Sequence, residues 1–191
     1  MKILFVCTAN ICRSPMAEYL LRQALDDRQV AGIDTSSAGV RALVGHPMDG
    51  SAAYAVEQLG ADGSGHVARQ LGAEFIRQSD LVLTADSDHR ARATREVPGA
   101  MRRVFTLKEF TRLGAAVAQE AGPPRPSPVG DRFARRVADV AAQRGRVGPG
   151  AENADNIGDP FRAAPAVMQA TAEEIADQIG LLCWILGLDS S

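Results

Sequence analysis

The hydrophobic positions of the chain alternate between two patterns. Short apolar runs, typical of buried strands, are followed by segments whose apolar positions recur every three or four residues, which is typical of helices. The predicted strands cover residues 2–6, 33–40, 80–84 and 101–106, and the predicted helices cover residues 14–25, 49–59, 88–97 and 107–113. This alternation predicts an α/β fold of three layers, in which helices flank a central four-stranded parallel sheet.

Residues 114–154 depart from this alternation. They are rich in Ala, Arg, Gly and Pro, and the run 122–128 holds four prolines. Within this segment the pattern predicts a helix over residues 131–144, and we expect its flanks to be mobile. The apolar side of that helix comprises Phe133, Val137, Val140 and Ala141.

A last helical pattern begins at residue 165 or 171 and ends at residue 186. A chain of 191 residues has room for one domain with a substantial core. We therefore expect a single domain over residues 1–191. The positions of the last helix predicted to face its core are Val167, Ile175, Ile179, Leu182 and Ile185.

The composition is ordinary for a globular protein, with 46% hydrophobic residues, 23% charged residues and a net charge of −2. This balance argues against bulk binding to nucleic acid or to an anionic membrane, so any anion site is local. No apolar run approaches the ~20 residues that span a bilayer, and no signal-peptide pattern is present, so we expect a cytoplasmic protein. Three cysteines do not indicate a disulfide framework, and Cys183 is interpreted as a buried apolar residue.

The strongest chemical signal is the loop after the first predicted strand. Cys7 and Arg13 bracket this loop, and Ser14 and Pro15 begin the helix that follows. In open α/β sheets, ligands bind beyond the carboxyl ends of the strands, and a helix N-terminus attracts anions. A thiol and a guanidinium in this position indicate a site that holds a phosphate-like dianion against a nucleophilic sulfur.

A nucleophilic cysteine must be ionised, whereas a free thiol with a pKa of ~8.5 is only a few per cent thiolate at neutral pH. The helix N-terminus, the N–H groups of the loop and Arg13 all favour the anion. Arg differs from Lys here, because its planar fork holds two phosphate oxygens at once. Ser14 can cap the helix and donate to the sulfur, while the small side chains of Thr8 and Ala9 let the backbone close around an anion.

Residues 6–18, VCTANICRSPMAE, resemble the signature of the low-molecular-weight protein tyrosine phosphatase family, in its bacterial type. Ala9 stands where the family generally has Gly, and a left-handed backbone at this position would be harder for Ala. The resemblance extends over roughly residues 1–113 and 155–187, so residues 114–154 are interpreted as an insertion within the phosphatase domain. Three further stretches fall in the family's order: residues 36–39, 66–71 and 159–161.

The resemblance implies roles for individual residues. Cys7 would form a cysteinyl-phosphate, Arg13 would hold the equatorial oxygens, and Asp159 would act as the general acid and then as the base. No metal ion or other cofactor is implied. The hydrogen-bond network that supports the loop would consist of Asn10, Ser37 and His66. The implied phosphate-binding positions are Thr8, Ala9, Asn10, Ile11, Cys12 and Ser14.

The resemblance also bears on specificity and regulation. Family members with Thr before the second loop cysteine are protein-arginine phosphatases, whereas Ile11 resembles the tyrosine-directed members. Leu43 and Phe161 lie where bacterial members place apolar or aromatic walls, which suits a flat aromatic leaving group. The implied partner is a tyrosine-phosphorylated protein, by analogy a bacterial tyrosine kinase of polysaccharide export. Cys12 would form a reversible disulfide with Cys7, and the alternative is that Cys12 packs behind the loop.

Three other functions stay open at this point. A thiol-coupled arsenate reductase of the same fold would need cysteines between Cys12 and Cys183, where the chain has none. A protein-arginine phosphatase shares the loop, and a non-catalytic phosphoprotein-binding module would not need Cys7, Arg13 and Asp159 together. We assign no role beyond polar surface to five other ionisable side chains: His46, His89, Glu96, Arg102 and Arg103.

Overall fold

The computed structural model describes residues 1–121, 129–148 and 151–188. The strand order of its central four-stranded sheet is β2-β1-β3-β4, so the first strand lies between β2 and β3. All three strand pairs are parallel, which confirms the predicted α/β sheet. The strands are β1 (Lys2–Cys7), β2 (Asp34–Gly39), β3 (Leu81–Thr84) and β4 (Val104–Thr106).

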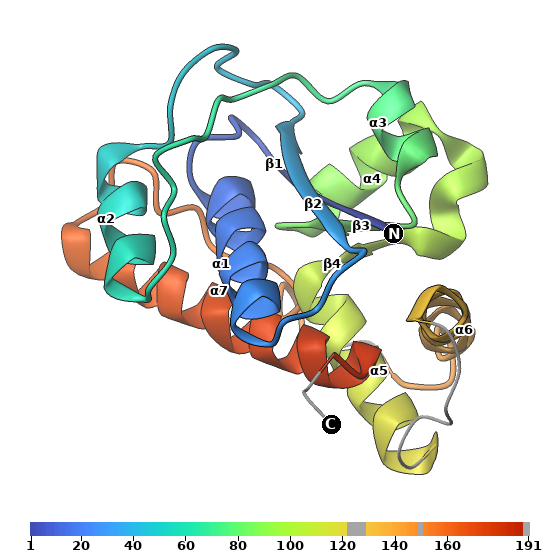
Figure 1. Cartoon of the computed structure of the whole chain (residues 1–191). Helices are drawn as coiled ribbons and strands as arrows, with labels where there is room; N and C mark the ends of the chain where they lie inside the picture. The colour runs from blue at the N-terminus through green and yellow to red at the C-terminus, as the bar shows by residue number, and fades with distance from the viewer. Residues whose placement is uncertain (122–128, 149–150, 189–191) are drawn as a thin grey trace.

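Helices cover both faces of the sheet (Figure 1). One face carries α1 (Arg13–Asp27), α5 (Leu107–Ala121) and α7 (Pro165–Leu186), with α2 (Gly50–Gln58) packed against α7. The other face carries α3 (Ala73–Gln78), α4 (Ser87–Glu96) and the 3₁₀ helix η1 (Pro98–Arg103). Helix α6 (Val129–Ala142) contacts α5 and η1. Among these described helices, none is long and apolar enough to cross a membrane.

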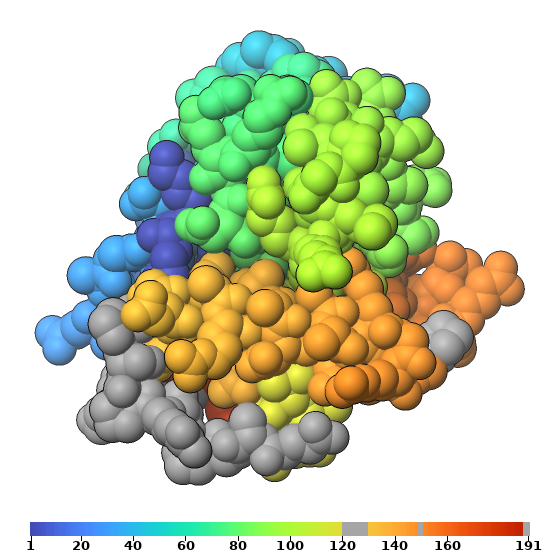
Figure 2. Space-filling model, turned by 90° about the vertical axis from the view of Figure 1, so that its right-hand side faces the viewer, coloured from blue at the N-terminus to red at the C-terminus, as the bar shows by residue number. Residues whose placement is uncertain are grey.

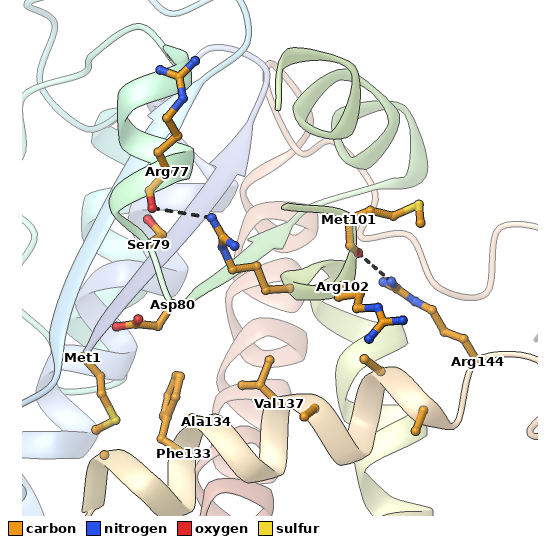
Figure 3. A pocket seen from close by; sticks show the side chains of 15 residues that line it. Met1, Arg77, Ser79, Asp80, Met101, Arg102, Phe133, Ala134, Val137 and Arg144 are labelled. Carbon is orange, nitrogen blue, oxygen red and sulfur yellow. Dashed lines mark hydrogen bonds between the residues drawn. The ribbon is translucent and has the colours of Figure 1, made fainter. Parts of the chain in front are cut away.

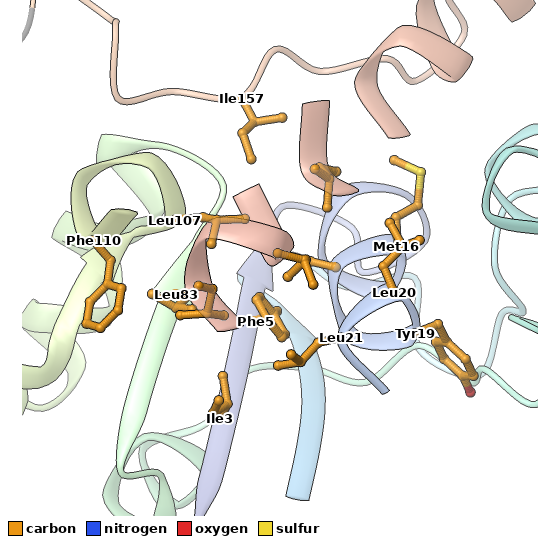
Figure 4. Close-up of a cluster of buried hydrophobic side chains, with 14 of the residues drawn as sticks. Ile3, Phe5, Met16, Tyr19, Leu20, Leu21, Leu83, Leu107, Phe110 and Ile157 are labelled. Atoms are coloured by element: carbon orange, nitrogen blue, oxygen red, sulfur yellow. The ribbon is translucent and has the colours of Figure 1, made fainter. Parts of the chain in front are cut away.

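The strands are buried on both sides because helices cover both faces of the sheet. Phe5, Leu83 and Phe110 belong to the larger core, which residues of α1 and α7 complete (Figure 4). Leu4 and Val6 enter a smaller core with residues of α3, α4 and η1. Successive residues of β1 therefore point into different cores, which explains why this strand is continuously apolar in sequence.

Two elements on the α4 face differ from the predictions. Strand β4 begins at Val104 rather than at residue 101, because Pro98 starts η1 and residues 101–103 belong to that helix. Proline suits the first helical turn, where its missing N–H costs no hydrogen bond. Helix α3 was not predicted, since it is six residues long and Ile76 is its one buried position.

The predicted end of the helix over residues 107–113 is wrong, because α5 continues to Ala121. The segment that departs from the sequence pattern begins at Gly114, yet Gly114 lies where α5 crosses α7. A Cβ added at Gly114 would come within 2.8 Å of the Ile185 side chain. Glycine at this point allows the two helices to pack closely, and residues 114–121 continue a helix of the main fold rather than begin a separate segment.

Helix α6 confirms the helix predicted within residues 131–144, and its positions Phe133, Val137 and Val140 are buried. In α7, four of the five predicted core positions are buried, but Val167 is exposed and Met168 is buried in its place. The predicted mobility of the segments beside α6 falls on residues 122–128 and 149–150, which lie outside the described residues.

Candidate active site

The loop after β1 is held at the carboxyl edge of the sheet by segments that follow other strands. Three N–H groups of residues 40–43, which come after β2, donate to the carbonyls of residues 7–9 at 2.9–3.0 Å. Ala85, directly after β3, donates to the carbonyl of Val6 and accepts from the N–H of Ile157, both at 2.8 Å. The stretch that contains Asp159 therefore reaches the same edge, where open α/β folds bind ligands.

The thiol of Cys7 is buried, and its sulfur lies 2.9 Å from the hydroxyl oxygen of Ser14. The Nδ2 group of Asn10 donates to the same hydroxyl oxygen at 3.0 Å. A serine hydroxyl has one proton. Because Ser14 Oγ accepts from Asn10, its own proton is available for a hydrogen bond to the sulfur.

Asn10 organises the loop with both its side chain and its backbone. Its φ of 58° places it in the left-handed region, which Asn tolerates better than most residues. Ala9 does not have a positive φ, so the absence of Gly at position 9 causes no strain of this kind. The Asn10 side chain also donates to Ser37 Oγ at 2.8 Å and accepts from the N–H of Arg69 at 2.8 Å. Its carbonyl lies 2.7 Å from His66 Nε2, so Asn10, Ser37 and His66 do come together.

A buried glutamate extends this network and was missed in the sequence. Ser37 Oγ accepts from Asn10 and donates to Glu18 Oε2 at 2.6 Å, while Arg22 donates to Glu18 Oε1 at 2.6 Å. Glu18 is 6% exposed. Its spacing of four residues from Ser14 places both on one side of α1, and this was the available sequence signal.

The guanidinium of Arg13 is buried beneath the loop and is held from several directions. Its NH1 group donates to the carbonyl of Ile157 at 3.0 Å and lies 3.4 Å from Asp86 Oδ2. Its NH2 group lies 3.0 Å from Asp159 Oδ2. The Arg13 side chain is 6% exposed and that of Asp159 is 53% exposed, so a buried cation meets a carboxylate at the surface.

Asp86 and His89 form a second support that the sequence did not reveal. His89 is buried, not solvated as expected, and its Nε2 lies 2.8 Å from Thr8 Oγ1. The His89 N–H donates to Asp86 Oδ1 at 2.9 Å, and the His89 Nδ1 lies 2.9 Å from the same oxygen. In the described part of the chain, no third His, Cys, Asp or Glu joins them in a group that would hold a metal ion.

The carboxylate of Asp86 stays ionised far below neutral pH. Burial raises the pKa of Asp86, but hydrogen bonds from His89 and the charges of His89 and Arg13 outweigh it and hold the pKa at about 2. Asp86 is therefore an anion that orients Arg13 throughout the neutral range. Asp86 lies two residues after β3 and is the N-cap of α4. This position after a strand could have indicated a residue at the carboxyl edge of the sheet.

Cys12 and Ile11 both point away from solvent. Burial, followed by the negative charges of Asp49, Cys7 and Asp159, raises the pKa of the Cys12 thiol to about 12, so Cys12 is protonated at neutral pH. Cys7 and Cys12 are free thiols here, and their disulfide stays a prediction. Ile11 is 6% exposed and belongs to the larger core, so its side chain is part of that packing rather than of an open wall.

Two segments near the loop carry exposed apolar side chains, which we call the rim. Leu43 and Phe161 are each 42% exposed, and Val44 is 65% exposed. The N–H of Leu43 binds the carbonyl of Ala9 at 3.0 Å, and the N–H of Phe161 donates to Asp159 Oδ1 at 3.3 Å. Both predicted wall residues therefore lie on backbone segments that are tied to the loop or to Asp159.

Replacing Gly39 by Ala is expected to displace the loop. A Cβ at Gly39 would lie 2.6 Å from the Thr8 carbonyl oxygen and 3.0 Å from the Asn10 nitrogen, and backbone atoms cannot yield as a flexible side chain does. We expect the free energy of unfolding to fall by about 1–3 kcal/mol and kcat/KM for an aryl phosphate to fall about 10²-fold. Urea unfolding and steady-state kinetics measure the two effects. The control is Gly72→Ala, since a Cβ there meets nothing within 4 Å; normal activity in Gly39→Ala would contradict the close approach.

Several known proteins are similar to this chain in sequence or in fold. The family model described as low molecular weight phosphotyrosine protein phosphatase matches residues 2–145. The low molecular weight protein-tyrosine-phosphatase Etp of Escherichia coli is 46% identical over 96 residues, which are 50% of this chain and 62% of Etp. The protein-arginine-phosphatase of Geobacillus stearothermophilus is 38% identical over 109 residues, which are 57% of this chain and 70% of that protein. The solved low molecular weight protein tyrosine phosphatase of T. tengcongensis matches with a TM-score of 0.70 at 27% identity, over 95% of this chain and 97% of that chain.

The extent of these matches differs between parts of the chain. The alignment with Etp spans less than two thirds of the length of Etp. The match to the family model includes the loop after β1, Ser37, His66 and Asp86, and it ends before Asp159. Because that match covers most of the chain and includes the whole sheet, the chain belongs to the low-molecular-weight phosphotyrosine protein phosphatase family.

Proposed function

We propose that the chain hydrolyses phosphotyrosine in proteins through a cysteinyl-phosphate intermediate. The observation that carries this proposal is the contact of 2.9 Å between Cys7 Sγ and Ser14 Oγ, in a loop that also holds the buried guanidinium of Arg13. A thiol with a dedicated hydrogen-bond donor, beside a fixed cation and at a helix N-terminus, is equipped to act as a nucleophile.

In the first step, the phosphate dianion of the substrate binds the loop N–H groups and Arg13. The Cys7 thiolate attacks phosphorus, the S–P bond forms, and the bond from phosphorus to the tyrosine oxygen breaks. Asp159 gives its proton to the departing oxygen. Asp159 lies 3.0 Å from the Arg13 NH2 group, so a bound phosphate would compete with it for the guanidinium and leave the carboxyl group beside the leaving group.

In the second step, water displaces the sulfur. The Asp159 carboxylate takes a proton from the water, the new P–O bond forms and the S–P bond breaks, which releases phosphate. The leaving thiolate again accepts a hydrogen bond from the Ser14 hydroxyl. The Ser14 proton is free for this bond because Asn10 donates to the oxygen of the same hydroxyl. Asp86 keeps Arg13 in place through both steps.

The rim favours an aromatic substrate. Leu43 and Phe161 are partly exposed on segments adjoining the loop, and a flat ring between them would bury apolar surface. The relative named protein-arginine-phosphatase keeps phosphoarginine as the second candidate. Ile11 favours tyrosine through the resemblance alone, since its side chain is buried.

The other rivals have less support. Cys183 is fully buried in α7, and no cysteine lies between Cys12 and Cys183, so an arsenate reductase would lack its thiol relay. A binding module without activity would not need an acid at the surface beside Arg13. The proposed partner is a tyrosine-phosphorylated protein, by analogy a bacterial tyrosine kinase of polysaccharide export. The proposed compartment is the cytoplasm, which keeps thiols reduced.

Turnover of p-nitrophenyl phosphate and of matched peptides that carry phosphotyrosine, phosphoserine or phosphoarginine tests this function. We expect the highest kcat/KM on the phosphotyrosine peptide. A preference for phosphoarginine would establish the second candidate, and thioredoxin-dependent reduction of arsenate at a comparable rate would establish the reductase. Absence of turnover with every phosphorylated substrate would overturn the proposed function.

Asp159→Asn is expected to slow hydrolysis in a manner that depends on the leaving group. An amide cannot protonate the departing oxygen, so kcat should fall about 10²-fold for phenyl phosphate and much less for p-nitrophenyl phosphate, whose leaving group is a weak base. Asp155→Asn is the matched control, because Asp155 pairs with Arg112 at 2.6 Å instead of with Arg13. Equal losses with both substrates would refute the acid role.

A further inference from the structure

Helix α6 encloses a cavity at the end of the sheet opposite to the phosphate loop. The cavity has a volume of about 730 Å³ and includes Met1, which precedes β1, whereas Cys7 ends that strand. Figure 2 shows α6 lying across this face of the molecule, beneath residues of α3 and η1. The other walls come from the ends of α3 and η1 and from the start of β3. The cavity is thus distinct from the candidate active site.

The floor of the cavity is apolar. Phe133, Ala134 and Val137 project from α6 toward the end of the sheet (Figure 3). Phe133 and Val137 are also buried against the larger core, which ties the floor to the rest of the fold. Ala138 and Ala141 continue it along the helix and leave the space above them open. A ligand body that lies here would contact hydrocarbon.

The wall opposite the floor is strongly basic. Four arginines line the cavity, and the one acidic lining residue is Asp80, which accepts from the N–H of Lys2 at 2.8 Å. The Arg144 guanidinium already has protein partners, because it donates to Glu109 Oε1 at 2.9 Å and to the carbonyl of Met101 at 2.8 Å. Arg77 lies 3.7 Å from Glu74. The two remaining arginines, Arg102 and Arg103, have no carboxylate partner among the described residues.

Arg103 is the most informative of these side chains. Its Nε atom is buried without a hydrogen-bond partner, and its NH2 group makes a long contact of 3.5 Å with the carbonyl of Arg77. Buried polar groups are nearly always satisfied, and an orphaned donor needs an explanation. Arg102 adjoins Arg103 in sequence and lines the same cavity, so two guanidinium groups without a carboxylate partner among the described residues border this space.

We infer that this cavity binds a small organic anion with an apolar body and a phosphate or carboxylate head. The body would lie on α6, and the head would be bound by Arg102 and Arg103 through charge-assisted hydrogen bonds. The volume falls within the usual range of ligand pockets, about 300–1,000 Å³. Helix α6 would thereby form the floor of a second site.

Binding of 8-anilinonaphthalene-1-sulfonate to the full chain, followed by the fluorescence of the dye, tests this inference. The dye has an apolar body and an anionic sulfonate, and it is not a phosphate ester. We expect saturable binding that weakens about tenfold in Arg103→Gln, as the loss of one charge-assisted hydrogen bond implies. Ala134→Trp should weaken binding, because the larger side chain would cover part of the apolar floor. Arg92→Gln, on the exposed side of α4, and Arg13→Lys, in the phosphate loop, should leave binding unchanged.

Displacement of the dye by laurate would identify an acyl carboxylate as the ligand type, and displacement by adenosine 5′-monophosphate would identify a nucleotide.

Thermal unfolding midpoints within a few degrees of the unmodified chain would show that Arg103→Gln and Ala134→Trp are folded. Binding that neither substitution alters, that Arg13→Lys abolishes, or that neither laurate nor the nucleotide competes with would overturn the inference. These readouts do not depend on hydrolysis, so they remain informative whether or not the proposed phosphatase activity is found.

Discussion

Cys7→Ser is expected to lower the turnover of p-nitrophenyl phosphate by about 10³-fold or more. A serine hydroxyl ionises far less readily than a thiol, and the single hydrogen bond from Ser14 at 2.9 Å cannot offset that difference. Binding of an oxyanion should survive, because Arg13 and the loop N–H groups remain. Steady-state kinetics together with calorimetric titration of orthovanadate separate the two effects.

The matched control is Cys12→Ser, in the same loop. The Cys12 thiol is 4% exposed and its pKa of about 12 keeps it protonated, so we expect kcat to change by less than about tenfold. A loss in Cys12→Ser as large as that in Cys7→Ser would contradict the assignment of Cys7 as the nucleophile. Loss of vanadate binding in Cys7→Ser would instead indicate that the loop depends on the sulfur for its shape.

Arg13→Lys is expected to lower kcat/KM by about 10²–10³-fold, although it preserves the charge. The guanidinium reaches the carbonyl of Ile157 and the carboxylates of Asp86 and Asp159. Its NH2 group also lies 3.5 Å from Thr8 Oγ1 in the loop. An ammonium is a point charge and cannot hold these partners and two equatorial oxygens of a phosphoryl group together. Kinetics with p-nitrophenyl phosphate measure the loss, which we expect mainly in kcat.

Arg41→Lys provides the control for this substitution. Arg41 is exposed, and its backbone N–H binds the carbonyl of Thr8 at 2.9 Å, so it lies beside the same loop without entering the network beneath it. We expect kcat/KM within about twofold of the unmodified chain, as is usual for a surface substitution. If Arg13→Lys behaved like Arg41→Lys, charge alone would suffice and the bidentate role would be wrong.

The sheet and the phosphate loop were predictable because their signals are local. Strands β1 and β3 are buried on both faces, so their apolar runs are continuous and short. Cys7, Arg13 and Ser14 lie on one strand, loop and helix unit, so their proximity follows from chain geometry. The errors arose where packing overrides propensity. Helix α5 continues through Gly114, where Ile185 of α7 leaves no room for a Cβ. Met168 is buried instead of Val167 because Met168 lies on the same face of α7 as Ala172 and Ile175.

The fold class and the strand, loop and helix unit that carries Cys7, Arg13 and Ser14 could thus be predicted from sequence, since each depends on residues within a few positions of one another. The residues that support this unit became visible in the tertiary structure alone. Asp86 is 73 positions from Arg13, His89 is 81 positions from Thr8, and Glu18 reaches Ser37 across the sheet edge. The cavity beneath η1 likewise exists because α6 packs there. Parallel strands bring their carboxyl ends to one edge of the sheet regardless of their separation in sequence. A local sequence pattern therefore cannot show which polar side chains become buried together at that edge.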